Sequence, residues 1–269
     1  FSPMSLKTGR EADMKEAMKW FDIVKPHFFR APLDNDKGFG NWIAKDWKNN
    51  RLDSPETATV KPLDAKRNAD GTVTVTTTQE CRYANGKITT DYVYTMDADG
   101  SVDFSATYTP EGQLPPLPCI GNTFLMDKDM TRLSWYGQGL QDSYVDRLEA
   151  TSIGRWTSSV DQEYVHYPRP QSSGNHEQTV TLSLTDAKGR GYTVTTANAT
   201  PFAFSALPYS EHQLSTVAHD CDLHTENNVF LNIDAAMMGL GNSSCGPGVL
   251  TKYSIPQKQH SLHVMFKRK

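Results

Sequence analysis

Polar and apolar residues alternate with a period of two along much of this chain of 269 residues. The alternating runs are rich in Thr and Val, which suit the half-buried surface of a pleated sheet. Short segments rich in Gly, Asp and Ala join two pairs of these runs, which predicts antiparallel hairpins. The expected strands are residues 72–76, 91–95, 102–108, 179–184, 192–196, 229–233 and 262–266.

Few segments have a helical pattern. Residues 11–20 carry apolar side chains at helical spacing, and residues 210–214 are expected to begin a short helix with Ser210 as its N-cap. Three prolines in residues 113–118 predict a loop or an edge crossing. Because no internal repeat or clear linker divides the chain, we predict an all-β fold, a large antiparallel sandwich in one main domain.

Composition argues against several classes of function. A formal net charge of −4 gives no electrostatic support for binding nucleic acid or an anionic membrane. The longest apolar run is too short to span a bilayer. The chain opens on Phe1 rather than an initiator Met, so a cytoplasmic and a periplasmic location both stay open.

The cysteines are widely spaced and form no C-x-x-C pair, which argues against a zinc site and against a disulfide framework. We therefore expect free thiols that are mostly buried. The four residues are Cys81, Cys119, Cys221 and Cys245.

A dense polar motif follows the aromatic pair at residues 28–29. The short side chains of Asp34, Asn35 and Asp36 can hydrogen-bond nearby backbone groups and so hold a sharp turn, closed by Gly38. Arg30 can offer its five-donor fork to such carboxylates. A glycoside hydrolase needs two carboxyl groups across the scissile bond, but these two belong to one tight turn without an apolar pocket. A structural role is therefore favoured over a catalytic one.

Other candidates for chemistry are dispersed. The Gly-flanked segment of residues 243–246 contains Cys245, which would be reactive only beside a base. His219 and His224 could bracket a metal, or act with Glu226 as the base and acid of a sugar mutarotase. Packed or hydrogen-bonded histidines are the simpler interpretation. Aromatic rings could stack on sugars, although at least half of them are expected in the core: Trp42, Trp47, Trp135, Tyr136, Tyr144, Trp156, Tyr164 and Tyr167.

Five segments carry a family resemblance when taken in order. Residues 117–121, Leu-Pro-Cys-Ile-Gly, are similar to a Leu-Pro-Arg-Ile-Gly motif, with Cys119 in the place of the arginine. Residues 135–147 are similar to the signature W-x-G-x-G-P-x-E-N-Y-x-D-R. The others are residues 29–38, 170–176 and 231–247. Together they resemble the small-chain, or C-terminal, domain of the bacterial β-galactosidases of glycoside hydrolase family 2.

The resemblance implies a β-supersandwich of the galactose mutarotase type over residues 25–269, with residues 1–24 as a poorly matched lead-in segment. It implies that this domain completes the aglycone side of a sugar site and supports assembly of a homo-oligomer. A TIM barrel that the chain does not contain would hydrolyse terminal β-galactosides. We therefore expect no catalytic residue, metal or cofactor here, with Mg and Na bound in other domains of a parent enzyme, and no activity from the chain alone.

The resemblance also implies site residues. The substrate-binding set is Gly38, Phe39, Asn41 and Trp42 in the loop after the turn, with Asn242, Ser244 and Cys245. Cys245 stands where an aglycone-stacking tryptophan occurs in the enteric enzyme, so aglycone preference is expected to differ. The structural motif comprises Arg30, Asp34, Asn35, Asp36, Trp135, Tyr144, Asp146 and Arg147. A stand-alone carbohydrate-binding module and a mutarotase-like epimerase are the alternatives.

Overall fold

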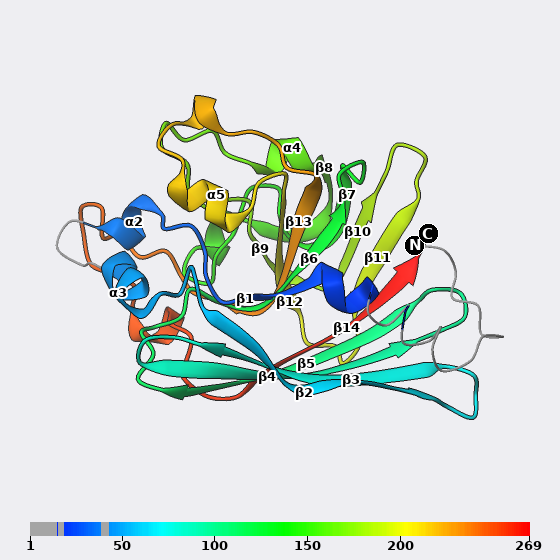
Figure 1. Ribbon diagram of the computed structural model, residues 1–269. Helices are drawn as coiled ribbons and strands as arrows, with labels where there is room; N and C mark the ends of the chain where they lie inside the picture. Colours follow the sequence, from blue (N-terminus) through cyan, green and yellow to red (C-terminus); the bar gives the residue numbers. More distant parts are fainter. Residues whose placement is uncertain (1–14, 16–18, 39–42) are drawn as a thin grey trace.

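The computed structural model describes residues 15, 19–38 and 43–269, and within them strands form two packed sheets (Figure 1). Every strand pair that it gives is antiparallel, which confirms the predicted all-β sandwich. The smaller sheet has five strands, in the order β1 (Val24–His27), β6 (Cys119–Asp127), β13 (Asn228–Met237), β12 (Phe202–Leu207) and β9 (His176–Thr179).

The larger sheet has nine strands, and its longest strands lie in the lower layer of Figure 1. Strand β14 (His260–Arg268) lies inside this sheet between β5 (Val102–Gly112) and β11 (Gly191–Thr196). The order is β2 (Glu56–Arg67), β3 (Val73–Arg82), β4 (Gly86–Met96), β5 (Val102–Gly112), β14 (His260–Arg268), β11 (Gly191–Thr196), β10 (Thr181–Thr185), β7 (Arg132–Gly139) and β8 (Ser152–Ser159).

Helices are short and lie at one end of the sandwich and over the outer face of the smaller sheet (Figure 1). Residues 19–23 are helical and lead into β1. No helix among the described residues is long and apolar enough to cross a membrane. The α-helices with printed bounds are α2 (Asp34–Lys37), α3 (Ile43–Asn50), α4 (Val160–Glu163) and α5 (Glu211–Thr216). The 3₁₀ turns are Leu148–Ala150, Asp220–Asp222 and Thr251–Tyr253.

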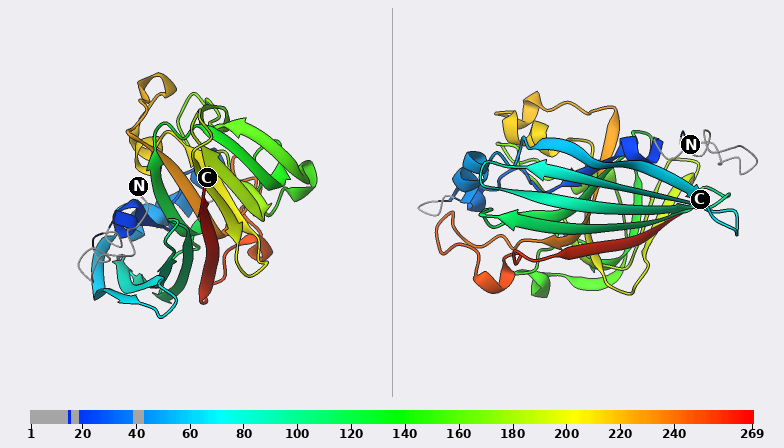
Figure 2. Two further views of the ribbon diagram at one scale, coloured as in Figure 1. Left: turned by 90° about the vertical axis from the view of Figure 1, so that its right-hand side faces the viewer. Right: turned by 60° about the horizontal axis from the view of Figure 1, so that its bottom comes forward.

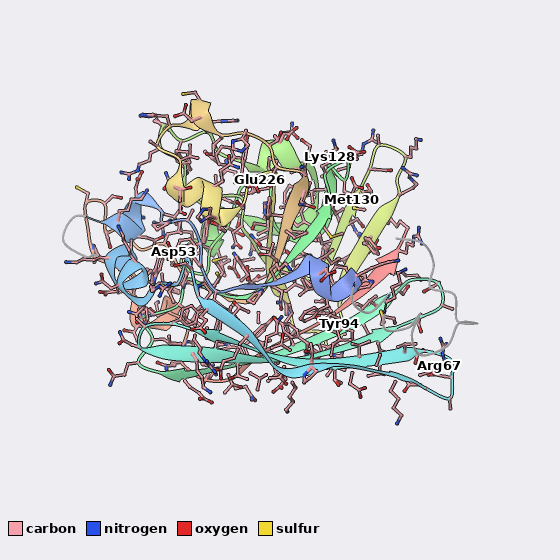
Figure 3. All side chains as sticks on the ribbon, viewed as in Figure 1. Asp53, Arg67, Tyr94, Lys128, Met130 and Glu226 are labelled. Atoms are coloured by element: carbon pink, nitrogen blue, oxygen red, sulfur yellow. The ribbon has the colours of Figure 1, made fainter. Side chains whose placement is uncertain are left out.

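The main core lies between the two sheets and is rich in aromatic rings. Alternate residues of β5 are buried, because successive side chains of a strand point to opposite faces. Phe104 meets Phe124 edge to face at 5.2 Å between ring centroids, and Phe124 lies 4.7 Å from Phe266. Tyr94 belongs to the same core, and Figure 3 shows it between the two sheets. Aromatic packing across the layers therefore joins β5, β6 and β14.

Each of the seven predicted strands lies in or overlaps a strand of the structure, and both predicted hairpins are confirmed. The loop at residues 113–118 is also confirmed. The Ser210 hydroxyl accepts the backbone N–H of Gln213, as expected of an N-cap of α5. The predicted helix at residues 11–20 lies mostly outside the described residues.

The cysteine prediction is half right. All four thiols are free, and Cys81 and Cys119 are buried, but Cys221 and Cys245 are exposed. Cys245 lies in the segment that follows β13, which leaves the sheet and runs beside α2. Figure 2 shows α2, α3 and this segment at one end of the sandwich, away from the C-terminus. The polar motifs at residues 30–38 and 239–247 therefore meet at one end of the sandwich.

Candidate functional site

Arg30 is the centre of this end of the molecule, although it is 1% exposed. Its Nε and Nη2 atoms donate to the two carboxylate oxygens of Asp36 at 3.1 and 2.8 Å. Nη1 donates to the carbonyl of Met238 at 3.0 Å, and Nη2 to that of Gly239 at 3.3 Å. A bidentate pair with further carbonyl partners satisfies a buried guanidinium. Arg30 thus joins the turn after β1 to the segment after β13.

The turn itself is the short helix α2. Asp36 accepts the backbone N–H of Leu33 at 3.0 Å, so its carboxylate serves both the turn and Arg30. Gly38 closes the turn with a φ of 56° and donates its N–H to the Asp34 carbonyl at 2.9 Å. This positive φ favours glycine over residues with a side chain. The predicted structural turn is therefore present, and Asp36 is not available as a catalytic acid.

Asp146 and Arg147 hold the segment of residues 239–247 from the other side. The Asp146 carboxylate accepts the backbone N–H groups of Leu240 and Gly241, the latter at 2.8 Å. Arg147 donates to the carbonyl of Gly241 at 2.6 Å and to the side-chain oxygen of Asn242 at 3.1 Å. The D-R pair of the sequence signature therefore fixes the backbone of this segment.

Asn35 links α2 to the same segment. Its side-chain amide donates to the Gly241 carbonyl at 2.8 Å, and its side-chain oxygen accepts from the backbone and hydroxyl of Ser244. Cys245 donates its backbone N–H to the Asn242 carbonyl at 3.0 Å, which closes a tight turn. These hydrogen bonds fix the segment of residues 239–247, which we call the rim. The side chains of Asn242, Ser244 and Cys245 are exposed on it. Three predicted substrate-binding residues are thus brought together.

Asp34 is 67% exposed, in contrast to the buried Asp36. Its backbone N–H donates to the side-chain oxygen of Gln171 at 2.9 Å, so residues 170–176 also meet the turn. Gln171 and Glu211 are contacts that the sequence did not single out as site residues. Glu211 accepts from the Ala31 N–H and from the Ser172 hydroxyl. Gln171 lies in residues 170–176, one of the five segments that carry the family resemblance, which could have pointed to it. Glu211 lies in none of these segments.

The aromatic candidates divide as expected. Trp47 is 0% exposed and donates its indole N–H to the Pro116 carbonyl at 2.8 Å. The Arg30 guanidinium lies 5.7 Å from the Trp47 ring centroid and 6.0 Å from that of Tyr144. Trp135 and Tyr164 are also buried, Trp156 is partly buried, and Tyr136 and Tyr167 are exposed. Phe39, Asn41 and Trp42 lie outside the described residues.

The histidine candidates do not converge. His219 and His224 are both exposed, and no group in the described part of the chain that could hold a metal includes them. The Glu226 carboxylate accepts from the backbone and hydroxyl of Ser210 and from Gln213, beside the start of α5 (Figure 3). Through these hydrogen bonds Glu226 stabilises the start of α5. Such a structural role agrees with the simpler interpretation better than the role of a mutarotase acid does.

We expect the Asp146→Asn variant to lose about 1–3 kcal/mol of stability, because an amide has one acceptor oxygen where the carboxylate has two. Hydrogen exchange at the Leu240 and Gly241 amides should become faster, since both donate to Asp146. The exposed Asp129→Asn serves as the matched control and should leave both amides unchanged. Equal exchange in the two variants would contradict the role given to Asp146.

The family model described as the β-galactosidase small chain matches residues 4–266. A β-galactosidase of Streptococcus thermophilus is 32% identical over 218 residues, which cover 81% of this chain and 21% of that protein. The β-galactosidase BgaC of Bifidobacterium adolescentis is 35% identical over 186 residues, covering 67% of this chain and 17% of that protein.

The chain therefore spans about a fifth of the length of these curated relatives. Among solved structures, it is similar to a GalM/aldose epimerase homologue from C. elegans, with a TM-score of 0.35 and 11% identity. The similar region covers 78% of this chain and 69% of that one.

Proposed function

Because the chain belongs to the β-galactosidase small chain family, we propose that it forms the aglycone side of the sugar site in a β-galactosidase-type glycoside hydrolase. In this proposal a TIM barrel elsewhere in the parent enzyme cleaves terminal β-galactosides. The chain supplies a shaped rim and supports assembly of a homo-oligomer. Mg and Na would be bound by other domains, and the aglycone-side role would need no cofactor from this chain.

One observation carries the proposal: segments that are far apart in the sequence build a single rigid rim. Arg30 reaches residues 238–239, Asn35 reaches Gly241 and Ser244, and Arg147 reaches Asn242. A substrate-positioning surface must be held by its supporting shell, and this one is held by charged groups and backbone hydrogen bonds. The exposed side chains on the rim carry amide, hydroxyl and thiol groups.

The role of Cys245 can be tested in the parent enzyme. A thiol offers no ring to stack on an aglycone, whereas an indole would add stacking worth about 1 kcal/mol, or about 2- to 10-fold in affinity. We expect Cys245→Trp to lower KM by that factor for a nitrophenyl β-galactoside, with a smaller effect on kcat. Cys221→Trp is the matched control, because Cys221 is also exposed but lies in a different segment.

Unchanged kinetics in Cys245→Trp, or the same change in both variants, would remove Cys245 from the aglycone side.

The chain on its own should not turn over a nitrophenyl β-galactoside. It should also leave the mutarotation of fresh α-galactose, followed by polarimetry, at the uncatalysed rate. Turnover in either assay would contradict the proposal, and saturable sugar binding by the chain alone would favour a carbohydrate-binding module.

A further inference from the structure

Three neighbouring strands of the smaller sheet place a histidine and an aspartate on either side of a glycine. His27 of β1 is in register with Gly121 of β6, and Gly121 is in register with Asp234 of β13. His27 Nδ1 reaches across to Asp234 Oδ1 at 2.7 Å. A Cβ on Gly121 would lie 2.3 Å from that same oxygen. The missing side chain is therefore what allows the two outer residues to meet.

Cys119 adds a thiol to this pair. It lies two residues before Gly121, and therefore on the same face of β6. Its Sγ atom is 3.8 Å from Nε2 of His27. One possible ligand atom from each of the three residues lies within 4.8 Å of the other two. The side chains of His27, Cys119 and Asp234 are 4%, 0% and 0% exposed.

The group is not explained by hydrogen bonding alone. Asp234 Oδ2 is buried and has no partner, which is unusual because buried polar atoms are nearly always paired. The order of thiol, imidazole and carboxylate resembles a nucleophilic triad, but Cys119 is inaccessible. Burial also raises the pKa of the Cys119 thiol to about 11, so it is not an activated nucleophile. The aglycone-side role proposed above does not use these residues.

We propose that this group is a site for a divalent cation of the zinc class. Cys119 Sγ and His27 Nε2 are the ligands, and Asp234 orients the imidazole through Nδ1. In tetrahedral zinc sites, bonds of about 2.0 Å to nitrogen and about 2.3 Å to sulfur separate the two ligand atoms by about 3.5 Å. The observed 3.8 Å needs only a small closure. A carboxylate behind a ligating histidine is the usual support, and a thiolate favours zinc over magnesium or calcium.

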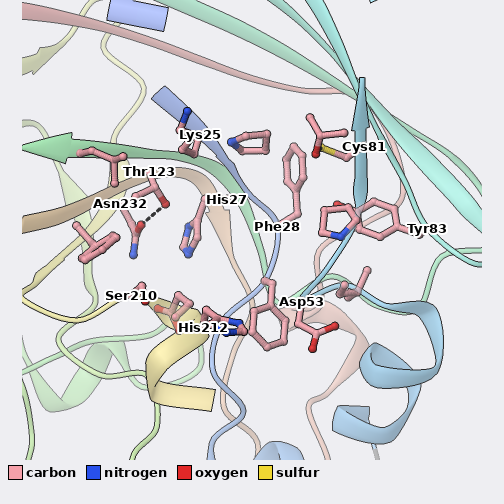
Figure 4. A pocket seen from close by; sticks show the side chains of 18 residues that line it. Lys25, His27, Phe28, Asp53, Cys81, Tyr83, Thr123, Ser210, His212 and Asn232 are labelled. Carbon is pink, nitrogen blue, oxygen red and sulfur yellow. Dashed lines mark hydrogen bonds between the residues drawn. The ribbon is translucent and has the colours of Figure 1, made fainter. Parts of the chain in front are cut away.

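Of the three residues, His27 also borders a pocket. The volume of this pocket is about 390 Å³, and Figure 4 shows the His27 ring in the wall between Asn232 and Phe28. Water from this pocket can complete the coordination of an ion that has two protein ligands. The other charged groups are committed elsewhere: Arg30 to Asp36, and Glu211 to Ala31 and Ser172. With two protein ligands, the site would be weaker than a four-ligand structural zinc site.

Cobalt(II) is the probe for the experiment, because a thiolate bound to cobalt gives a charge-transfer band in the near ultraviolet. The full chain carries Cys221→Ser and Cys245→Ser, which remove the two exposed thiols. We expect one cobalt per chain, the charge-transfer band, and displacement by zinc. Adding Cys119→Ser should abolish the band. Cys81→Ser, another buried thiol, is the matched control and should leave it unchanged.

Asp234→Asn should keep the band but weaken cobalt binding by about 10- to 100-fold, as expected when a supporting carboxylate is lost. No stoichiometric uptake, or a band that survives in Cys119→Ser, would overturn the proposal. If Cys119→Ser does not fold, X-ray absorption by the zinc-loaded chain that carries only Cys221→Ser and Cys245→Ser identifies the ligand atoms. One sulfur neighbour per zinc supports the site, and a shell of nitrogen and oxygen alone rejects it.

Discussion

Arg30→Met is expected to lower the free energy of unfolding by about 3–5 kcal/mol, the range for breaking a buried ion pair on one side. The variant leaves the Asp36 carboxylate buried without its bidentate partner. It also leaves the carbonyls of Met238 and Gly239 without a donor that they have in the structure. Urea unfolding followed by circular dichroism measures the change.

Arg82→Met is the matched control for Arg30→Met. Arg82 pairs with Glu80 but is 55% exposed, and Lys87 also contacts that carboxylate. Exposed pairs contribute about 0–1 kcal/mol, so this variant should unfold close to the wild type. The double variant Arg30→Met/Asp36→Leu should recover part of the loss, because it removes the unpaired charge. Similar losses in Arg30→Met and Arg82→Met would refute the role assigned to Arg30.

The second large effect concerns pH and Glu177. Burial raises the pKa of this carboxyl to about 8, although the Asn175 side chain donates to it at 3.1 Å. The folded chain therefore holds a proton that the unfolded chain releases near pH 4.5. Stability from this group is complete below that pH and is lost as the pH rises toward 8. At 1.36 kcal/mol per unit, the loss is at most about 5 kcal/mol.

Glu177→Gln resembles the protonated carboxyl at every pH. We expect the variant to be more stable than the wild type at pH 8, and the two to converge near pH 5. Unfolding in urea at several pH values gives the difference curve, which isolates this residue from other titrating groups. Glu149→Gln is the control, because Glu149 is exposed and should give a flat difference. A flat curve for Glu177→Gln would mean that its carboxyl stays ionised in the folded chain.

Strands such as β4 and β5 were predicted because their two faces differ in burial. In β4 and β5, buried and more exposed positions alternate, so the period of two is visible. The edge strand β2 was missed because it is exposed at most positions and contains Pro62, which leaves no alternation to detect. β6 was missed for the opposite reason, because its first four residues are all buried.

Sequence motifs predict only those contacts of the site that join residues close together in the chain. The pairing of Arg30 with Asp36 spans six residues and could be inferred from a turn motif. The contact of Arg30 with the Met238 carbonyl spans 208 residues and depends on the order of strands in the smaller sheet. The meeting of His27 with Asp234 likewise depends on register across Gly121. Such contacts follow from topology, which periodicity does not determine.

The place of β14 bears on how the chain can be assembled. This strand is the last of the chain, yet it joins β5 on one side to β11 on the other. Until it is inserted, the larger sheet exists as two separate halves, each with an open edge that invites pairing with other chains. Strand β5 therefore depends on residues 260–268, far from it in the sequence, to cover its open edge. Fragments that end before residue 260 would keep most of the sequence but lose the continuity of the sheet.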